Sequence, residues 1–270
     1  DGTPAIKAMY ALEKALYDNA DRIVAVTDSF VDEIAAKGVP RSKVRVVKNG
    51  VDLDMFRPGP ADPALRTKLG FDGKFVAAYV GTHGMAHGLG TILDAAAILK
   101  ARGDDGIRFL LIGEGADKQA LVERAKAESL DNVVFLGQQK HADIPDLVRA
   151  ADATLVLLKG KELFKTVIPS KIFEFMGVGR PIVLGVDGEA RRIVEDANGG
   201  VFVPPESAEA VVEALVALRS DPARRATMGH DGRAYVERHF SRAALARNYL
   251  KLLDALLAER AGAMPEAVAA

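Results

Sequence analysis

Short runs of apolar residues alternate along this chain with longer segments in which apolar residues recur three and four positions apart. The short runs predict strands over Arg22–Thr27, Val44–Val47, Phe75–Val80, Arg108–Ile112, Val133–Leu136, Thr154–Leu158, Pro181–Leu184 and Gly200–Val203. The longer segments predict helices over Leu89–Arg102, Ala116–Ser129, Ala142–Ala150, Ser170–Val178, Glu189–Asp196 and Ala208–Ser220. This alternation is typical of the α/β class, in which helices cover both faces of a parallel sheet.

One segment, Lys48–Pro63 ("KNGVDLDMFRPGPADP"), is rich in Asn, Gly, Asp and Pro and predicts a turn followed by a linker. Only two strands and two helices are expected before it, too few to close a doubly wound sheet. After Val203 the pattern predicts only helices, ending with one over Arg242–Leu257. We therefore expect the end of an N-terminal domain at 1–48, a linker at 49–63, a Rossmann-like domain at 64–240, a C-terminal helix at 241–260 and a tail at 261–270.

The composition of the 270 residues narrows the class of protein. Half of the chain is hydrophobic (49%), enough to bury one large core or two modest ones. Lys and Arg number 36 and Asp and Glu 37, so the overall charge gives no reason to expect nucleic acid as a partner. The lack of cysteine excludes disulfides, thiolate catalysis and cysteine-based zinc sites. With no signal peptide and no apolar run near the ~20 residues of a membrane span, a cytoplasmic protein is expected.

Glycines and lysines gather in the loops that follow the predicted strands, where open α/β sheets bind ligands. These loops are "GTHGMAHGLG" (81–90), Gly113-Glu114-Gly115, Gly137, and "KGKELFKTVIPSK" (159–171) with its four lysines. Free N–H groups at helix starts and ammonium groups both favour a diphosphate. Each feature alone also has a structural interpretation: a tight turn, a solvated lysine cluster, or, for Glu174, a carboxylate that meets the helix dipole.

Five motifs in order give the combination a more specific meaning. They are "VVKNGVDLDMFRP" (46–58), "AAYVGTHGMAHGLGTILDAAAIL" (77–99), "FLLIGEGADKQAL" (109–121), "VVFLGQQKHADIPDLVRAADATLVLL" (133–158) and "PSKIFEFMGVGRPIV" (169–183). From about Ala20 to about Leu257 the chain resembles the donor-binding half of retaining glycosyltransferases of family 4. Within that family it is most similar to bacterial enzymes that build exopolysaccharide and O-antigen repeat units.

The resemblance implies a GT-B fold, in which two Rossmann-like domains face a cleft and the second holds the nucleotide sugar. Glu174 matches a carboxylate that holds the ribose hydroxyls, and Ser170 and Lys171 lie at the helix start that faces the diphosphate. The loop residues that match the family's donor site are Gly81, Thr82, His87, Gly88, Gly113, Glu114, Leu136 and Gly137. The segment Asn49–Asp52 matches the interdomain hinge.

The chain also departs from the family pattern at three positions. Thr166 stands where the first Glu of the Glu-x7-Glu motif is expected, so a contact to the donor sugar is in doubt. Thr82 replaces an Arg and His87 a Lys, so two cations expected at the diphosphate are missing or titratable. We expect Lys171, with Lys165 in reserve, to supply positive charge from the other side.

The implied reaction transfers a sugar from a UDP-sugar, or alternatively a GDP-sugar, to a glycan or lipid-linked acceptor with retention and without a metal cofactor. The catalytic residues stay unassigned, because the acceptor side belongs to the first domain. The resemblance therefore implies that an N-terminal domain or a separate partner chain supplies the acceptor side. Whether the protein also contacts the inner face of a membrane is left open by the sequence.

Several other functions remain as alternatives. The chain could be a nucleotide-sugar-binding module without catalysis of its own, and sugar-nucleotide epimerases share the two-domain architecture. A nicotinamide-dependent enzyme would need a G-x-G-x-x-G after the first strand, which the glycine pattern fails. Asp52-Leu53-Asp54 spells the metal-binding Asp-x-Asp of the other glycosyltransferase fold, but it lies in the hinge segment.

Overall fold

The computed structural model describes residues 2–263 and contains two compact units. One unit comprises the residues up to Asn49 together with those from Arg242 onward, and the second is Gly50–Ser241. The unit boundary falls inside the predicted linker. Linker residues Val51 and Phe56 are fully buried in the core of the second unit, so most of this segment packs as part of that unit.

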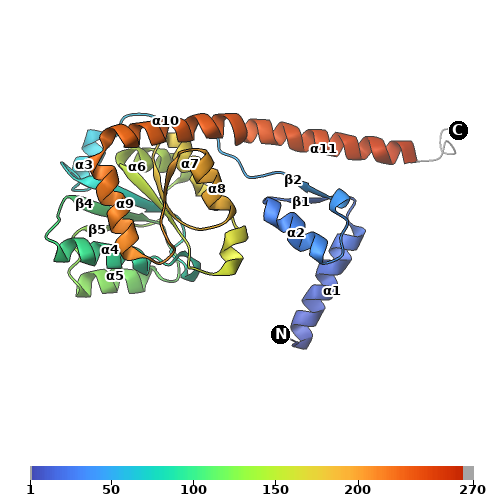
Figure 1. The fold of residues 1–270 in the computed structure, drawn as a ribbon, viewed down its shortest axis with the longest axis horizontal. Helices are drawn as coiled ribbons and strands as arrows, with labels where there is room; N and C mark the ends of the chain where they lie inside the picture. Colours follow the sequence, from blue (N-terminus) through green and yellow to red (C-terminus); the bar gives the residue numbers. More distant parts are fainter. Residues whose placement is uncertain (1, 264–270) are drawn as a thin grey trace. The chain divides into compact units, whose positions relative to one another are not determined.

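The second unit is built on a six-stranded parallel sheet (Figure 1). Its strands are β3 (Phe75–Val80), β4 (Ile107–Ile112), β5 (Val133–Leu136), β6 (Ala153–Leu157), β7 (Ile182–Gly185) and β8 (Gly200–Phe202). The spatial order β5-β4-β3-β6-β7-β8 runs outward in two directions from the β3–β6 pair. Ligands of such sheets bind outside the carboxyl ends of the strands where the order reverses, which here is between β3 and β6.

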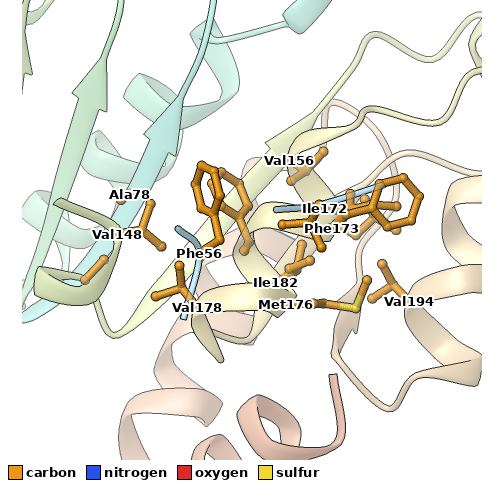
Figure 2. Close-up of a cluster of buried hydrophobic side chains, with 14 of the residues drawn as sticks. Phe56, Ala78, Val148, Val156, Ile172, Phe173, Met176, Val178, Ile182 and Val194 are labelled. Atoms are coloured by element: carbon orange, nitrogen blue, oxygen red, sulfur yellow. The ribbon is translucent and has the colours of Figure 1, made fainter. Parts of the chain in front are cut away.

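Helices cover both faces of this sheet, as the sequence predicts. Successive residues of β3 alternate between two cores: Val76 and Ala78 belong to one, and Ala77 and Tyr79 to the other. The first core is closed by α6 (Ile144–Ala150), α7 (Lys171–Val178), α8 (Glu189–Asp196) and α10 (Pro222–His239) (Figure 2). The second is closed by α4 (Gly90–Ala101), α5 (Lys118–Ala127) and α9 (Ala208–Ser220). The α/β fold class is therefore confirmed.

The observed strands, and the helices between them, end within two residues of the predicted positions. In the second unit, two α-helices have no predicted bounds: the short α3 (Pro63–Lys68) and the long α10, whose sequence "PARRATMGHDGRAYVERH" is mostly polar and buries few apolar side chains. Asp221 starts α10 by accepting a hydrogen bond from the Arg224 amide at 2.9 Å, and a proline follows in the first turn. Capping, rather than periodicity, marks this helix.

The first unit is small. It contains α1 (Pro4–Asn19), β1 (Ile23–Ala25), α2 (Asp28–Ala36), β2 (Val44–Val46) and α11 (Arg242–Ala263), with β1 and β2 paired in parallel. Helix α11 continues past the predicted end at Leu257, so Ala261–Ala263 are helical rather than part of a tail; residues 264–270 lie outside the described part. Within residues 2–263, no helix combines the length and apolar character needed to cross a membrane.

Candidate functional site

A cavity of about 290 Å³ opens where β3, β4 and β5 end. It is lined by Val80, Gly81, Thr82, Ile112, Gly113, Glu114, Gln138, Gln139 and Ile144. Four of the residues predicted from the sequence, Gly81, Thr82, Gly113 and Glu114, therefore share one hollow at the carboxyl edge of the sheet.

The floor of this cavity consists of two loops packed backbone against backbone. The Gly81 amide donates to the Ile112 carbonyl at 2.9 Å, and the His83 amide donates to the Glu114 carbonyl at 2.8 Å. Gly113 has a φ of 141°, and a Cβ there would lie 2.0 Å from the Gly81 carbonyl oxygen. Only glycine lets the loops approach so closely, which leaves main-chain atoms facing the cavity.

Leu136 and Gly137 extend this arrangement to the end of β5. The Leu136 carbonyl accepts a hydrogen bond from the Gly113 amide at 3.1 Å. A Cβ on Gly137 would lie 3.1 Å from Oε1 of Glu114, whose carboxylate pairs with Lys118 at 2.5 Å. The hydrogen bond from Lys118 is the main reason that the pKa of Glu114 is lowered.

Lys171, in the first turn of α7, reaches across to the end of β3. Its Nζ lies 4.3 Å from the centre of the Tyr79 ring, a cation–π contact. The same atom lies 2.5 Å from the position that a Cβ on Gly81 would take, so glycine at 81 makes room for this ammonium group. Burial lowers the pKa of Lys171 to about 8, while the charge of Glu174 acts in the opposite direction.

The two histidines of the 81–90 loop are held in a form that carries no charge at neutral pH. Burial, followed by the charge of Lys171, lowers the pKa of His87, whose ring lies 6.0 Å from that of Tyr79. His83 is fully buried, its pKa is lowered mainly by burial, and neither of its ring nitrogens has a hydrogen-bond partner among residues 2–263. Lys171 is thus a cation that the fold brings next to this loop at Gly81, and the side chain of Lys159 packs against it at Gly88. Gly88 takes the left-handed conformation (φ 58°) that ends the loop's helical turn.

Glu174 lies one turn along α7 from Lys171. One of its carboxylate oxygens is 3.8 Å from Nε2 of His141, whose ring packs edge-on against Phe56. Sequence reasoning did not single out His141, or the cavity-lining Gln138 and Gln139. All three lie in the connection that follows Gly137, and their position after a strand end was the available signal.

The remaining predicted residues lie in the connection between β6 and α7. Lys165 pairs with Glu162 at 2.7 Å, which raises its pKa, and the Thr166 hydroxyl donates to the Leu163 carbonyl at 2.8 Å. Both side chains are therefore engaged within their own 3-10 turn, Glu162–Thr166. Ser170 is the N-cap of α7 without a side-chain capping bond.

Asp52, the first aspartate of the Asp52-Leu53-Asp54 string, has a structural contact within the chain. Its Oδ1 accepts hydrogen bonds from the amides of Asp54 at 3.1 Å and Met55 at 3.0 Å and so stabilises a local turn. Within the part of the chain that the structure describes, no group of three or more His, Asp or Glu side chains could hold a metal ion. Metal independence itself stays a prediction.

Comparison with known proteins gives consistent family matches. A model of the family described as "Glycosyl transferases group 1" matches residues 62–235, and one described as "Glycosyltransferase Family 4" matches residues 2–55. The chain is 32% identical over 260 residues to a D-inositol 3-phosphate glycosyltransferase of Segniliparus rotundus, covering 93% of this chain and 56% of that protein. It is also 32% identical over 199 residues to a GDP-mannose-dependent mannosyltransferase of Corynebacterium glutamicum that acts on a monoacylated phosphatidylinositol monomannoside, covering 72% and 51%.

Solved structures share the fold. Alr3699/HepE of Anabaena in complex with UDP superimposes with a TM-score of 0.78 at 21% identity, over 89% of this chain and 65% of that one. Sucrose-phosphate synthase of Thermosynechococcus elongatus gives a TM-score of 0.75 at 24% identity, over 94% and 62%. The chain spans about half the length of the curated relatives it matches.

Proposed function

Because this chain belongs to the group 1 glycosyl transferases, we propose that its second unit binds the nucleoside-diphosphate sugar from which a glycosyl group is transferred to an acceptor hydroxyl with retention of configuration. The observation that carries this proposal is the start of helix α7. There Lys171 approaches Gly81, and Glu174 lies one turn further along the same helix. An ammonium group suits the diphosphate and a carboxylate suits the adjacent ribose diol, so the two side chains match neighbouring parts of the donor.

Each part of the donor has a proposed place. The diphosphate lies between Lys171, the Gly81–Gly88 loop and the positive end of α7, with Ser170 at the same helix start. The ribose hydroxyls donate to Glu174. The base enters the cavity of about 290 Å³, which is lined by Gln138 and Gln139 directly after Leu136 and Gly137. Lys165 and Thr166 would face the sugar only if their local contacts opened.

Uridine is the base we propose, since Alr3699/HepE was solved with UDP and with UDP-glucose. Guanosine is the alternative, since one relative is GDP-mannose-dependent. The departing diphosphate would be stabilised by the Lys171 ammonium group and main-chain N–H groups, a preorganised arrangement that needs no metal ion.

The acceptor side is proposed to come from an N-terminal domain or a partner chain. Helix α1 of the first unit exposes large apolar side chains, with Met9, Tyr10, Leu12 and Leu16 between 60% and 69% accessible. Such a surface suits coverage by another polypeptide segment. The acceptor would be a glycan or a lipid-linked sugar.

The alternative function is that of a nucleotide-sugar-binding module without catalysis of its own. Restoration of glycosyl transfer by a second polypeptide would decide against that alternative.

The proposal predicts that the chain binds UDP, with a smaller or no response to GDP and none to NAD. Calorimetric titration of each nucleotide, first with EDTA and then with magnesium, measures this. Saturable UDP binding that survives EDTA is the expected result. Binding that requires magnesium would contradict the metal-free site, and a preference for NAD would contradict the donor assignment.

Lys171 also predicts a pH dependence of donor binding. Because its pKa is lowered to about 8, the ammonium group is lost as the pH rises through that value, and UDP affinity should fall across it. At pH 7, Lys171→Met should bind UDP roughly ten- to hundredfold more weakly, the value of one charge-assisted contact of about 1.5–3 kcal/mol. Calorimetry between pH 6.5 and 9.5 tests both, with Lys126→Met on the exposed side of α5 as the matched control. If the affinity of the wild type for UDP did not change between pH 6.5 and 9.5, the proposed role of Lys171 would be refuted.

The lowered pKa of Lys171 also affects the stability of the fold. Its effect on stability rises with pH, whereas its effect on UDP affinity falls. Between pH 8 and the ordinary lysine value of 10.5, the unfolded chain holds the proton on Lys171 and the folded chain does not. Folding therefore releases a proton, and this group makes the free energy of unfolding rise with pH over that interval. In Lys171→Met this contribution should vanish, which denaturation at pH 8 and pH 10 would detect.

A further inference from the structure

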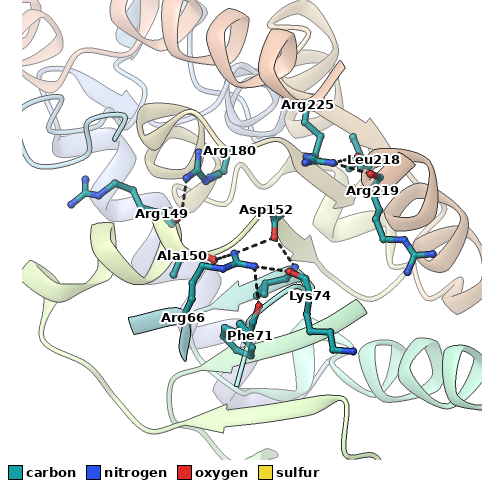
Figure 3. Close-up of polar contacts among 11 residues, drawn as sticks. Arg66, Phe71, Lys74, Arg149, Ala150, Asp152, Arg180, Leu218, Arg219 and Arg225 are labelled. Atoms are coloured by element: carbon teal, nitrogen blue, oxygen red, sulfur yellow. Dashed lines mark hydrogen bonds and ion pairs between the residues drawn. The ribbon is translucent and has the colours of Figure 1, made fainter. Parts of the chain in front are cut away.

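A second cavity, of about 250 Å³, lies at the opposite edge of the sheet. Asp152 and Pro181, which line it, directly precede β6 and β7, whereas the candidate donor site follows the carboxyl ends of strands. The charged side chains that line it are Arg66, Arg149, Asp152, Arg180 and Arg225 (Figure 3). Four guanidinium groups thus meet one carboxylate.

Two of these arginines have carboxylate partners. Arg66 lies 3.3 Å from Asp152 and gives further N–H groups to main-chain carbonyls, including that of Ala150 at 2.6 Å. Arg149 forms an ion pair with Asp146. The positive charges of Arg66 and Arg149 are therefore balanced by carboxylates of the same unit, and these two arginines have a structural role.

Arg180 and Arg225 differ, because within residues 2–263 neither forms an ion pair. Arg180 donates to the Arg149 carbonyl at 2.7 Å, and Arg225 donates to the Leu218 carbonyl at 2.6 Å. Nε of Arg180 is buried and has no hydrogen-bond partner in the described chain. Burial lowers the pKa of Arg180; Asp152 opposes this, and the other cavity arginines add to it. A partly buried guanidinium group that has arginine neighbours and no ion pair favours a bound anion.

We propose that this cavity binds a phosphate-type oxyanion, held by Arg180 and Arg225. A tetrahedral oxyanion accepts several N–H bonds at once, and the planar guanidinium fork suits it better than a single ammonium group does. Helix α10 begins beside the cavity, since Pro222, Arg225 and Ala226 of its first turns line it. The positive end of this 18-residue helix adds to the attraction.

The competing interpretation is that these arginines only cap main-chain carbonyls. It explains the bonds to Arg149 and Leu218 and the contact of Arg225 with the Phe75 ring. It leaves the charges of Arg180 and Arg225, which have no ion pair within residues 2–263, and the open cavity without a role. The two interpretations differ in one measurable property. A purely structural cluster binds no anion in solution, and an anion site does.

The test uses the exposed residue Ala226, which lines the cavity and donates no side-chain hydrogen bond. Ala226→Glu places a carboxylate beside the guanidinium groups without removing any carbonyl cap. Inorganic phosphate is titrated into the wild type and the variant by calorimetry and by phosphorus NMR. We expect saturable binding by the wild type at a site whose affinity for phosphate falls at least tenfold in Ala226→Glu. The matched control is Ala127→Glu, which adds the same charge at an exposed position of α5 outside the cavity-lining set and should bind phosphate like the wild type.

A second variant separates this cavity from the candidate donor site. Lys171→Met should keep the phosphate site that Ala226→Glu weakens, whereas loss of all phosphate binding in this variant would place the anion at the donor site and overturn the proposal. Absence of phosphate binding by the folded wild type, or equal weakening in Ala127→Glu and Ala226→Glu, would overturn it as well. Vesicles that contain phosphatidic acid form a further arm. We expect the cavity to bind inorganic phosphate in solution without any vesicle. Binding to the vesicles but not to dissolved phosphate would instead assign the cavity to a lipid headgroup.

Discussion

Replacing Glu174 by alanine is expected to weaken UDP binding by about a hundredfold or more. The proposed role of this carboxylate is to accept hydrogen bonds from both ribose hydroxyls. A hydrogen bond to a charged group contributes about 1.5–3 kcal/mol, so the loss of two amounts to roughly 3–6 kcal/mol, and each ~1.4 kcal/mol is a factor of ten in affinity. Calorimetric titration of UDP into the wild type and the variant at pH 7 measures this loss directly.

Two controls make the Glu174 result specific. Glu174→Gln keeps the shape of the side chain and its helix propensity but removes the charge, so its affinity should fall between those of wild type and Glu174→Ala. Glu195→Ala makes the same substitution on α8, where the carboxylate pairs with Arg191 on the surface, and should leave UDP binding unchanged. If Glu174→Ala kept wild-type affinity and a wild-type unfolding temperature, the ribose would have to be bound elsewhere.

Replacing Gly113 by alanine is expected to lower the free energy of unfolding by about 3 kcal/mol or more. The added methyl would lie 2.0 Å from the Gly81 carbonyl oxygen, which is main chain and cannot rotate away as a side chain could. Relief would require separating the loops that follow β3 and β4, with loss of the hydrogen bonds that join them. Overpacking typically costs about 1–3 kcal/mol, and a fixed backbone neighbour places this site at or beyond the upper end. Equilibrium denaturation in urea gives the value.

Gly73→Ala is the matched control for this prediction. Gly73 also has a positive φ, 66°, but a Cβ there would meet no atom within 4 Å. The left-handed conformation alone should cost this variant about 1–2 kcal/mol. The difference between the variants therefore reports the steric contact between the two loops together with the greater backbone strain of alanine at φ 141°. Similar losses in both would mean that the contact relaxes freely and that close loop packing does not shape the cavity.

The candidate site was partly readable from the sequence because its loops follow strands that are easy to recognise. Buried strands of a parallel sheet are continuous apolar runs, and glycine or proline marks their ends. Gly81, Thr82, Gly113 and Glu114 could therefore be predicted as donor-site residues, and the structure places them around one cavity. His141 was missed because a histidine in a polar connection carries no periodic signal. Its approach to Glu174 exists only after α6 and α7 have packed together.

The sequence by itself determined the class of fold, the strands and the loops that carry the candidate chemistry, because hydrophobic alternation and turn residues are local properties of the chain. The tertiary structure alone decided which of those residues meet and in which charge state. Lys171 and Gly81 are 90 positions apart, yet burial against Tyr79 lowers the pKa of that lysine to about 8 and keeps the charge beside the glycine loop. The arginine cavity has the same origin, since its members come from α3, α6, α10 and the turn after α7. Desolvation and charge–charge contacts depend on distance in space, which no local pattern encodes.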